Sequence, residues 1–99
     1  MIARIWHGKT KASDAAAYLE YLFKSGIPAY RATSGNKGAW VLRRIDHDVA
    51  HFITQSFSES REAIAAFAGD DIEVAKYYPE DERYLLEFEP TVTHYELFQ

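Results

Sequence analysis

The stretch that decides the fold is AWVLRRI (39–45), DHD (46–48) and VAHFITQSF (49–57). Both outer runs are rich in β-branched and aromatic residues, and neither contains glycine or proline. Two such runs joined by a short polar connector are typical of a β-hairpin. We therefore expect two antiparallel strands in the middle of the chain, and the remaining elements are assigned outward from them.

The register of this hairpin decides which arginine can reach a site. Adjacent residues of a strand point to opposite faces, so only one of Arg43 and Arg44 can face a given cavity. A two-residue turn places Arg43 beside Phe52 and Thr54, and a different turn length would favour Arg44. We choose Arg43 on the condition of a two-residue turn, and the turn length stays open.

Toward the N-terminus, a strand over Ile2–His7 precedes a helix. Ser13 is a suitable N-cap, and Gly26 with Pro28 beyond it predicts the helix end. Between these signals, apolar residues recur at helical spacing, which predicts one buried stripe (Ala15, Leu19, Leu22 and Phe23).

Toward the C-terminus, a second helix is predicted from the N-cap Ser60 to Gly69. DDIEVAKYY (70–78) predicts a short helical turn that Pro79 ends. A further turn within 80–87 is an open alternative. Val92–Phe98 alternates apolar with small or polar residues and predicts the last strand.

The resulting order is βαββαβ in 99 residues, which predicts a single α+β domain over residues 1–99. This is the ferredoxin-like arrangement, an antiparallel sheet with both main helices on one face. Neither side of the predicted strands is plainly polar, so the uncovered face needs a partner. We expect two copies to pack sheet to sheet as a homodimeric α/β barrel.

Composition excludes several classes of protein. The chain has no cysteine, which excludes disulfides, thiolate catalysis and thiol-ligated metals. No long apolar run or leader appears, so we expect a cytoplasmic protein that does not bind membranes. Residues 1–68 carry a net charge of +3 and residues 69–99 one of −7, which argues against nucleic-acid binding. The acidic block predicts a solvated face, with docking against a second copy as the alternative.

Three segments carry a family resemblance: the opening IARIWHG (2–8), the helix end AIAAFAG (63–69) and the closing VTHYELF (92–98). With the βαββαβ order, they resemble the antibiotic biosynthesis monooxygenase-like family over nearly the whole chain. The resemblance implies a dimeric α/β barrel with a pocket between sheet and helices or inside the barrel. It also implies that some relatives oxidise polycyclic phenols with molecular oxygen and no metal or flavin, and that others degrade haem.

The haem-degrading relatives carry an Asn on the first strand, a Trp at the end of the third and a ligating His after the second helix. By segment order these places fall near Trp6, Ser58 and Tyr77, none of which is the required residue. The resemblance therefore disfavours haem degradation here.

Cofactor-free oxygenation needs a dry aromatic slot, a base and a cation for the developing oxyanion. The chain offers Trp6 and Tyr77 for stacking, His94 as base, and Arg4 and Arg43 as cations. Phe52 and Thr54 join the substrate-binding set through their predicted place beside Arg43. Two alternatives stay open, since Trp6 could anchor a dimer interface and His94 could serve structure alone.

The other histidines predict no metal site. His47 and His51 are four residues apart, but they flank a predicted strand start, where that spacing does not converge. His7 is expected to turn toward the helices while Trp6 and Arg4 face the cavity.

The sequence thus favours a small cofactor-independent oxygenase acting on a phenolic or polyketide-like molecule. The alternative is a non-catalytic dimeric module of the same fold that binds a hydrophobic ligand or serves assembly. A polar group of shifted pKa in the pocket would favour the enzyme.

Overall fold

The predicted hairpin forms the centre of the structure, a computed structural model that describes residues 1–99. Strands β2 (Asn36–Asp46) and β3 (Val49–Ser58) pair antiparallel. Asp46 pairs with Val49, so the loop is the two residues His47 and Asp48, and Arg43 lies opposite Phe52. His47 has a φ of 55°, in the left-handed region that such tight hairpin turns require. The predicted hairpin is confirmed, and its turn has the two residues on which the choice of Arg43 depended.

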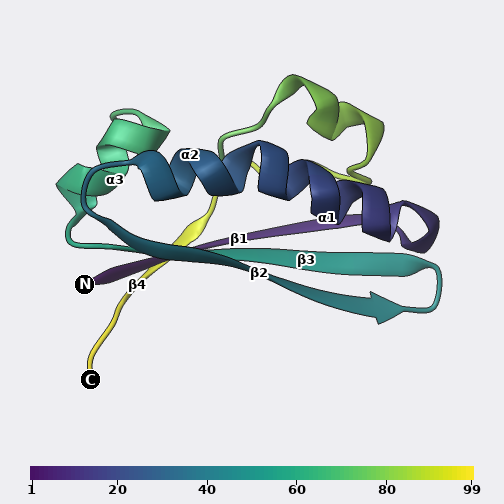
Figure 1. The fold of residues 1–99 in the computed structure, drawn as a ribbon, viewed down its shortest axis with the longest axis horizontal. Coiled ribbons are helices and arrows are strands. Elements are labelled where there is room, and N and C mark those ends of the chain that lie inside the picture. The colour runs from purple at the N-terminus through teal and green to yellow at the C-terminus, as the bar shows by residue number, and fades with distance from the viewer.

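The remaining strands complete a four-stranded sheet of order β2-β3-β1-β4. Strand β1 (Ile2–Lys11) lies between β3 and the short β4 (Thr93–Glu96), antiparallel to both. Figure 1 shows helices α1 (Ala15–Lys24), α2 (Gly26–Ala32) and α3 (Arg61–Ala68) on one face of this sheet. The ferredoxin-like α+β fold predicted from the sequence is confirmed.

The first helical region is longer than predicted. Gly26 does not end it, because α2 starts there after a break at Ser25. Pro28 lies in the first turn of α2. Backbone N–H groups in a first turn make no hydrogen bond within the helix, so the N–H that proline lacks is not missed there. Ser60 caps α3 by accepting a hydrogen bond from the Ala63 N–H, as predicted.

Of the helical turn predicted over residues 70–78, the structure has one hydrogen-bonded turn, in which the Val74 N–H donates to the Asp71 carbonyl. No helix follows it. The segment instead pairs with the chain before β4: the Ala75 N–H donates to the Pro90 carbonyl, and the Val92 N–H to the Glu73 carbonyl. A 3₁₀ turn follows at Pro79–Arg83, which overlaps the range 80–87 left open for a further turn.

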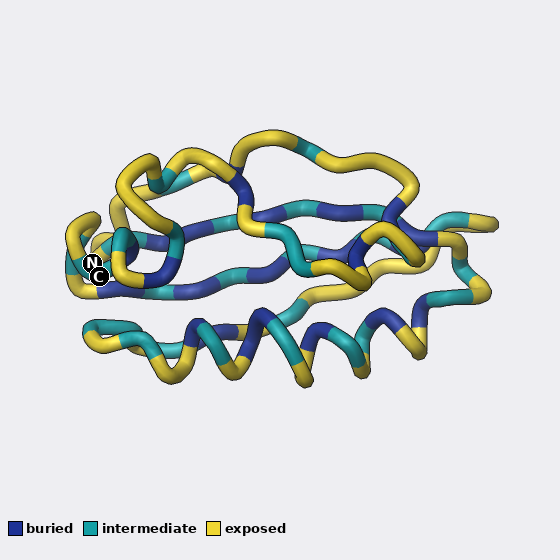
Figure 2. Tube along the Cα trace, turned by 90° about the horizontal axis from the view of Figure 1, so that it is seen from above, coloured by how far each residue is buried: buried dark blue, intermediate teal, exposed yellow.

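The two sheet faces have different surroundings. Arg4, Trp6, Phe52 and Thr54 point to the helical layer and are buried. Figure 2 shows the resulting alternation of buried and half-buried residues along the central strands. The opposite face of the sheet is covered by no helix and is called the open face below. His7 lies there, stacked on His51 with ring centres 5.6 Å apart. The prediction that His7 turns toward the helices is therefore wrong, because it must face away from Trp6.

Gly8 makes room for the indole of Trp6. A Cβ at Gly8 would come within 2.5 Å of the Trp6 Cζ2 atom. We expect Gly8→Ala to lower the free energy of unfolding by about 1–3 kcal/mol, the usual cost of overpacking, measured by urea denaturation. Gly26→Ala is the control, because its Cβ would meet nothing closer than 3.8 Å. An unchanged urea midpoint in Gly8→Ala would contradict this expectation.

Candidate functional site

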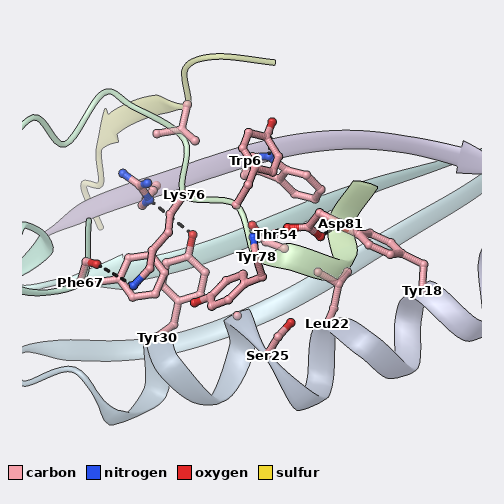
Figure 3. A pocket seen from close by; sticks show the side chains of 14 residues that line it. Trp6, Tyr18, Leu22, Ser25, Tyr30, Thr54, Phe67, Lys76, Tyr78 and Asp81 are labelled. Carbon is pink, nitrogen blue, oxygen red and sulfur yellow. Dashed lines mark hydrogen bonds between the residues drawn. The ribbon is translucent and has the colours of Figure 1, made fainter. Parts of the chain in front are cut away.

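A cleft lies between the helix-facing side of the sheet and a cover formed by the helices and the 75–81 segment. It measures about 410 Å³ including its mouth, but the centre of a water molecule can move through only about 30 Å³ of it. A larger molecule therefore enters only if side chains at the mouth move. Figure 3 shows the fourteen lining residues (Arg4, Trp6, Tyr18, Leu22, Ser25, Gly26, Tyr30, Thr54, Phe67, Lys76, Tyr77, Tyr78, Asp81 and Val92).

Six of the fourteen lining side chains are aromatic. The Trp6 N–H donates to the Tyr77 hydroxyl at 3.2 Å, and that hydroxyl donates to the Glu89 carbonyl at 2.6 Å. These bonds fix the indole in a dry position with Tyr77 edge-on to it, at 6.3 Å between ring centres. Trp6 thus lies in the cleft wall, on the side of the sheet away from the open face. The flat apolar wall suits a planar ligand.

Arg4 lies at one end of the cleft and is almost completely buried, at 2% exposure. Its guanidinium donates to the carbonyls of Ile72 and Val74 and to the Tyr30 hydroxyl. Period-two alternation places Arg4 and Trp6 on the same face, so this part of the predicted site holds together.

His94 lies behind Arg4 and does not line the cleft. Its Nε2 is 3.2 Å from Arg4 Nη1 and must accept that hydrogen bond, because a guanidinium can only donate. Burial, together with the charge of Arg4, lowers the pKa of His94, while Glu73, 3.4 Å from Nδ1, opposes the shift. His94 is thus a neutral imidazole that orients Arg4, and its basic nitrogen is not free for a ligand.

Asp81 is buried and lies at the end of the cleft away from Phe67 and Lys76, as Figure 3 shows. Its Oδ1 accepts from the Tyr18 hydroxyl at 2.9 Å and its Oδ2 from the Tyr78 N–H at 2.7 Å. Burial raises the pKa of Asp81 above its ordinary value, although both hydrogen bonds act in the other direction. Ionised carboxylate oxygens accept more than one hydrogen bond each, so Asp81 retains capacity for a ligand proton.

Sequence reasoning missed Asp81, because it lies in an acidic block interpreted as a solvated face. The signal that could have found it is Tyr78-Pro79-Glu80-Asp81, in which the carboxylate accepts from a backbone N–H three residues earlier at the start of a 3₁₀ turn. That bond turns Asp81 inward while its acidic neighbours stay in solvent.

The structure brings together four of the seven predicted site residues: Arg4, Trp6, Thr54 and Tyr77 line the cleft. Phe52 does not; it is fully buried in the core, edge-on to Tyr18. Arg43 is exposed, and the prediction that it faces the cavity is wrong. The reason is its place near the hairpin turn on an edge strand, where the helices no longer cover the sheet; Ile45, on the same side, is also exposed.

No group of three or more histidine, aspartate or glutamate side chains is arranged to hold a metal ion. The two stacked histidines, His7 and His51, share the open face with Glu89, whose carboxylate pairs with His7. None of the helices has the length and apolar character needed to cross a membrane.

Comparison with known proteins shows the fold. No protein-family model and no curated protein matches this chain. A solved structure of a mutant of MhuD, with two manganese protoporphyrin IX molecules bound per active site, matches at a TM-score of 0.61 and 18% sequence identity. The match covers 100% of this chain and 96% of the other. At this level of identity, the similarity extends to the fold alone.

Proposed function

We propose that the protein binds a planar phenolic or polyketide-type molecule in the cleft and oxidises it with molecular oxygen, without a cofactor. The observation that carries this proposal is Asp81, a buried carboxylate of raised pKa that faces an aromatic cleft. A base in such a place is matched to removing a proton from a weak carbon or phenol acid.

The chemistry we propose starts with proton removal. Asp81 takes a proton from the activated methylene or phenol, and the resulting electron-rich anion reduces dioxygen. For an anthrone-type methylene, the balance is R₂CH₂ + O₂ → R₂C=O + H₂O. Trp6 and Tyr77 hold the ring system and keep water out, and Arg4, oriented by His94, attracts the oxygen-bearing end of the ligand.

The porphyrin of the MhuD mutant is a poor fit to this cleft. Haem iron is held mainly by histidine, cysteine, methionine or tyrosinate, and no histidine or cysteine lines the cleft. Burial raises the pKa of both Tyr77 and Tyr78, so these phenols stay protonated and are weak ligands. We therefore propose no step through a haem.

We further propose a cytoplasmic homodimer joined through the open sheet face. Trp40, Leu42 and Tyr95 are each about half exposed there, and a shallow groove of about 620 Å³, including its open side, runs past Trp40, Leu42 and Phe57. Charged groups at the edge of this face are paired within the chain, as in Lys9–Glu87 at 2.8 Å. An apolar centre with a polar rim suits a second copy of the same surface.

The alternative is a non-catalytic dimer of the same fold that binds a hydrophobic ligand. The aromatic wall and the open sheet face support it equally, but such a module has no use for a buried carboxylate. Turnover separates the two, because a binding module would bind anthrone-type compounds without consuming oxygen.

Tryptophan fluorescence tests the proposed ligand. We expect anthrone-type and quinol-type compounds to quench Trp6, and Trp6→Phe to remove most of that change while the protein stays dimeric. Trp40, on the other face, supplies the constant background. With a metal chelator present, the protein should consume one molecule of oxygen for each molecule of product formed. Unchanged fluorescence with millimolar compound, or dissociation of the Trp6→Phe dimer, would contradict the proposal.

A further inference from the structure

The cation end of the cleft lacks a counterion. Arg4 is almost completely buried, yet its guanidinium has no carboxylate within ion-pair distance; its partners are carbonyls, a hydroxyl and a neutral imidazole. A buried charge is costly unless an opposite charge or many hydrogen bonds compensate it. Four of the five guanidinium N–H groups are accounted for by these partners, so one donor remains for a ligand.

A second cation lies at the same end. The ammonium of Lys76 donates to the Phe67 carbonyl at 3.2 Å and lies 4.6 Å from the centre of the Phe67 ring. The guanidinium carbon of Arg4 is 5.8 Å from the centre of that ring. Lys76 likewise has no carboxylate partner and keeps two free N–H donors. Both cations therefore lie within 5.8 Å of the centre of one aromatic ring, and neither forms an ion pair with a carboxylate.

A third donor completes the group. The Tyr78 hydroxyl is buried and has no hydrogen-bond partner, which is rare and costly for a buried polar atom. Figure 3 shows Tyr78 between Lys76 at one end of the cleft and Asp81 at the other. A ligand oxygen at the cation end would satisfy this hydroxyl along with the free donors of Arg4 and Lys76.

We propose that Arg4, Lys76 and Tyr78 form an anion subsite and that the ligand carries a carboxylate. This rests on the proposed function, because it assumes that the aromatic ligand binds in this cleft. The two carboxylate oxygens match the donors available, and Asp81 repels a second negative group at the far end. The ligand is thereby oriented, with its carboxylate at Arg4 and its acidic proton at Asp81.

The test compares an anthraquinone carboxylate with its uncharged carboxamide, by titration calorimetry and Trp6 quenching. We expect the carboxylate to bind about tenfold more tightly, equivalent to about 1.4 kcal/mol. Lys76→Met and Tyr78→Phe should each reduce that preference, because each should weaken binding of the carboxylate more than binding of the carboxamide. Lys76 is exposed, so Lys76→Met should fold, whereas a substitution of the buried Arg4 could prevent folding. Lys11→Met, at another exposed lysine without an acidic partner, is the control.

The outcomes are distinguishable. Equal binding of both probes to the wild-type protein overturns the anion subsite and leaves the proposed function standing. A carboxylate preference that survives both Lys76→Met and Tyr78→Phe also overturns it, because the charge would then be recognised elsewhere. If neither probe binds, the proposed function fails and the subsite fails with it.

Discussion

Replacing Asp81 by asparagine is expected to lower the rate of oxygenation by about 10²–10⁴-fold, the usual contribution of a positioned general base. Asparagine has the same shape, and its Oδ1 can still accept a hydrogen bond from the Tyr78 N–H. It cannot take a proton. Ligand affinity, measured by Trp6 quenching, should therefore change little while oxygen uptake nearly stops. Glu80→Gln, at the exposed neighbouring carboxylate, should leave the rate unchanged.

The pH dependence gives a second measure of the same group. The ionised form of Asp81 is the base, so the wild-type rate should rise with pH through a pKa above the ordinary 3.8, because burial raises it. The residual rate of Asp81→Asn should lack this rise. A variant that retains the wild-type rate would contradict the assignment of Asp81 as the base.

Stability separates a catalytic role from a structural one. A folded-state pKa above the unfolded value means that Asp81 favours the folded state below about pH 3.8. That contribution is lost as the pH rises through the folded-state pKa. At neutral pH the native chain holds a desolvated charge, so Asp81→Asn should unfold at the same temperature or a higher one. A large drop in Tm at neutral pH would indicate that Asp81 serves structure instead.

The hairpin was predictable because its evidence is local: two alternating runs, a short polar connector and a two-residue turn that sets the register. The 70–78 segment was not, because its backbone partners lie fifteen or more residues later, at Pro90 and Val92. Local sequence there favours a helical turn, and non-local hydrogen bonds outweigh that preference. The same pairing positions the cover of the cleft, so an error in this segment is also an error about the site.

In the candidate site too, what depends on local sequence was predictable and what depends on distant contacts was not. Period two correctly groups Arg4 with Trp6 and sets His7 apart from both, but it does not tell which group faces the helices when both faces are partly apolar. Arg43 has the predicted register and the wrong environment, because register says nothing about how far the helices extend over an edge strand. Asp81 could have been predicted as a site residue only by recognising the one turn that points it inward within the acidic block.

Replacing Leu42 by glutamate is expected to weaken self-association by at least about 2 kcal/mol, roughly thirtyfold in Kd, as for a central residue of an interface. Leu42 is 49% exposed in the single chain and lines the groove on the open face. In the proposed dimer, the new carboxylate would be buried opposite its own symmetry mate. Sedimentation should show a dimer for the wild-type protein and an 11.4 kDa species for Leu42→Glu at micromolar concentration.

The control is Phe23→Glu, since Phe23 is 45% exposed on α1, away from the open face. It should remain dimeric although it carries the same change of charge and polarity. The cleft lies on the other side of the sheet from Leu42, so ligand quenching of Trp6 should persist in the Leu42→Glu monomer. A wild-type chain that sediments at 11.4 kDa would exclude the dimer at that concentration. Equal dissociation of both variants would instead place the interface elsewhere, because only the open face distinguishes Leu42 from Phe23.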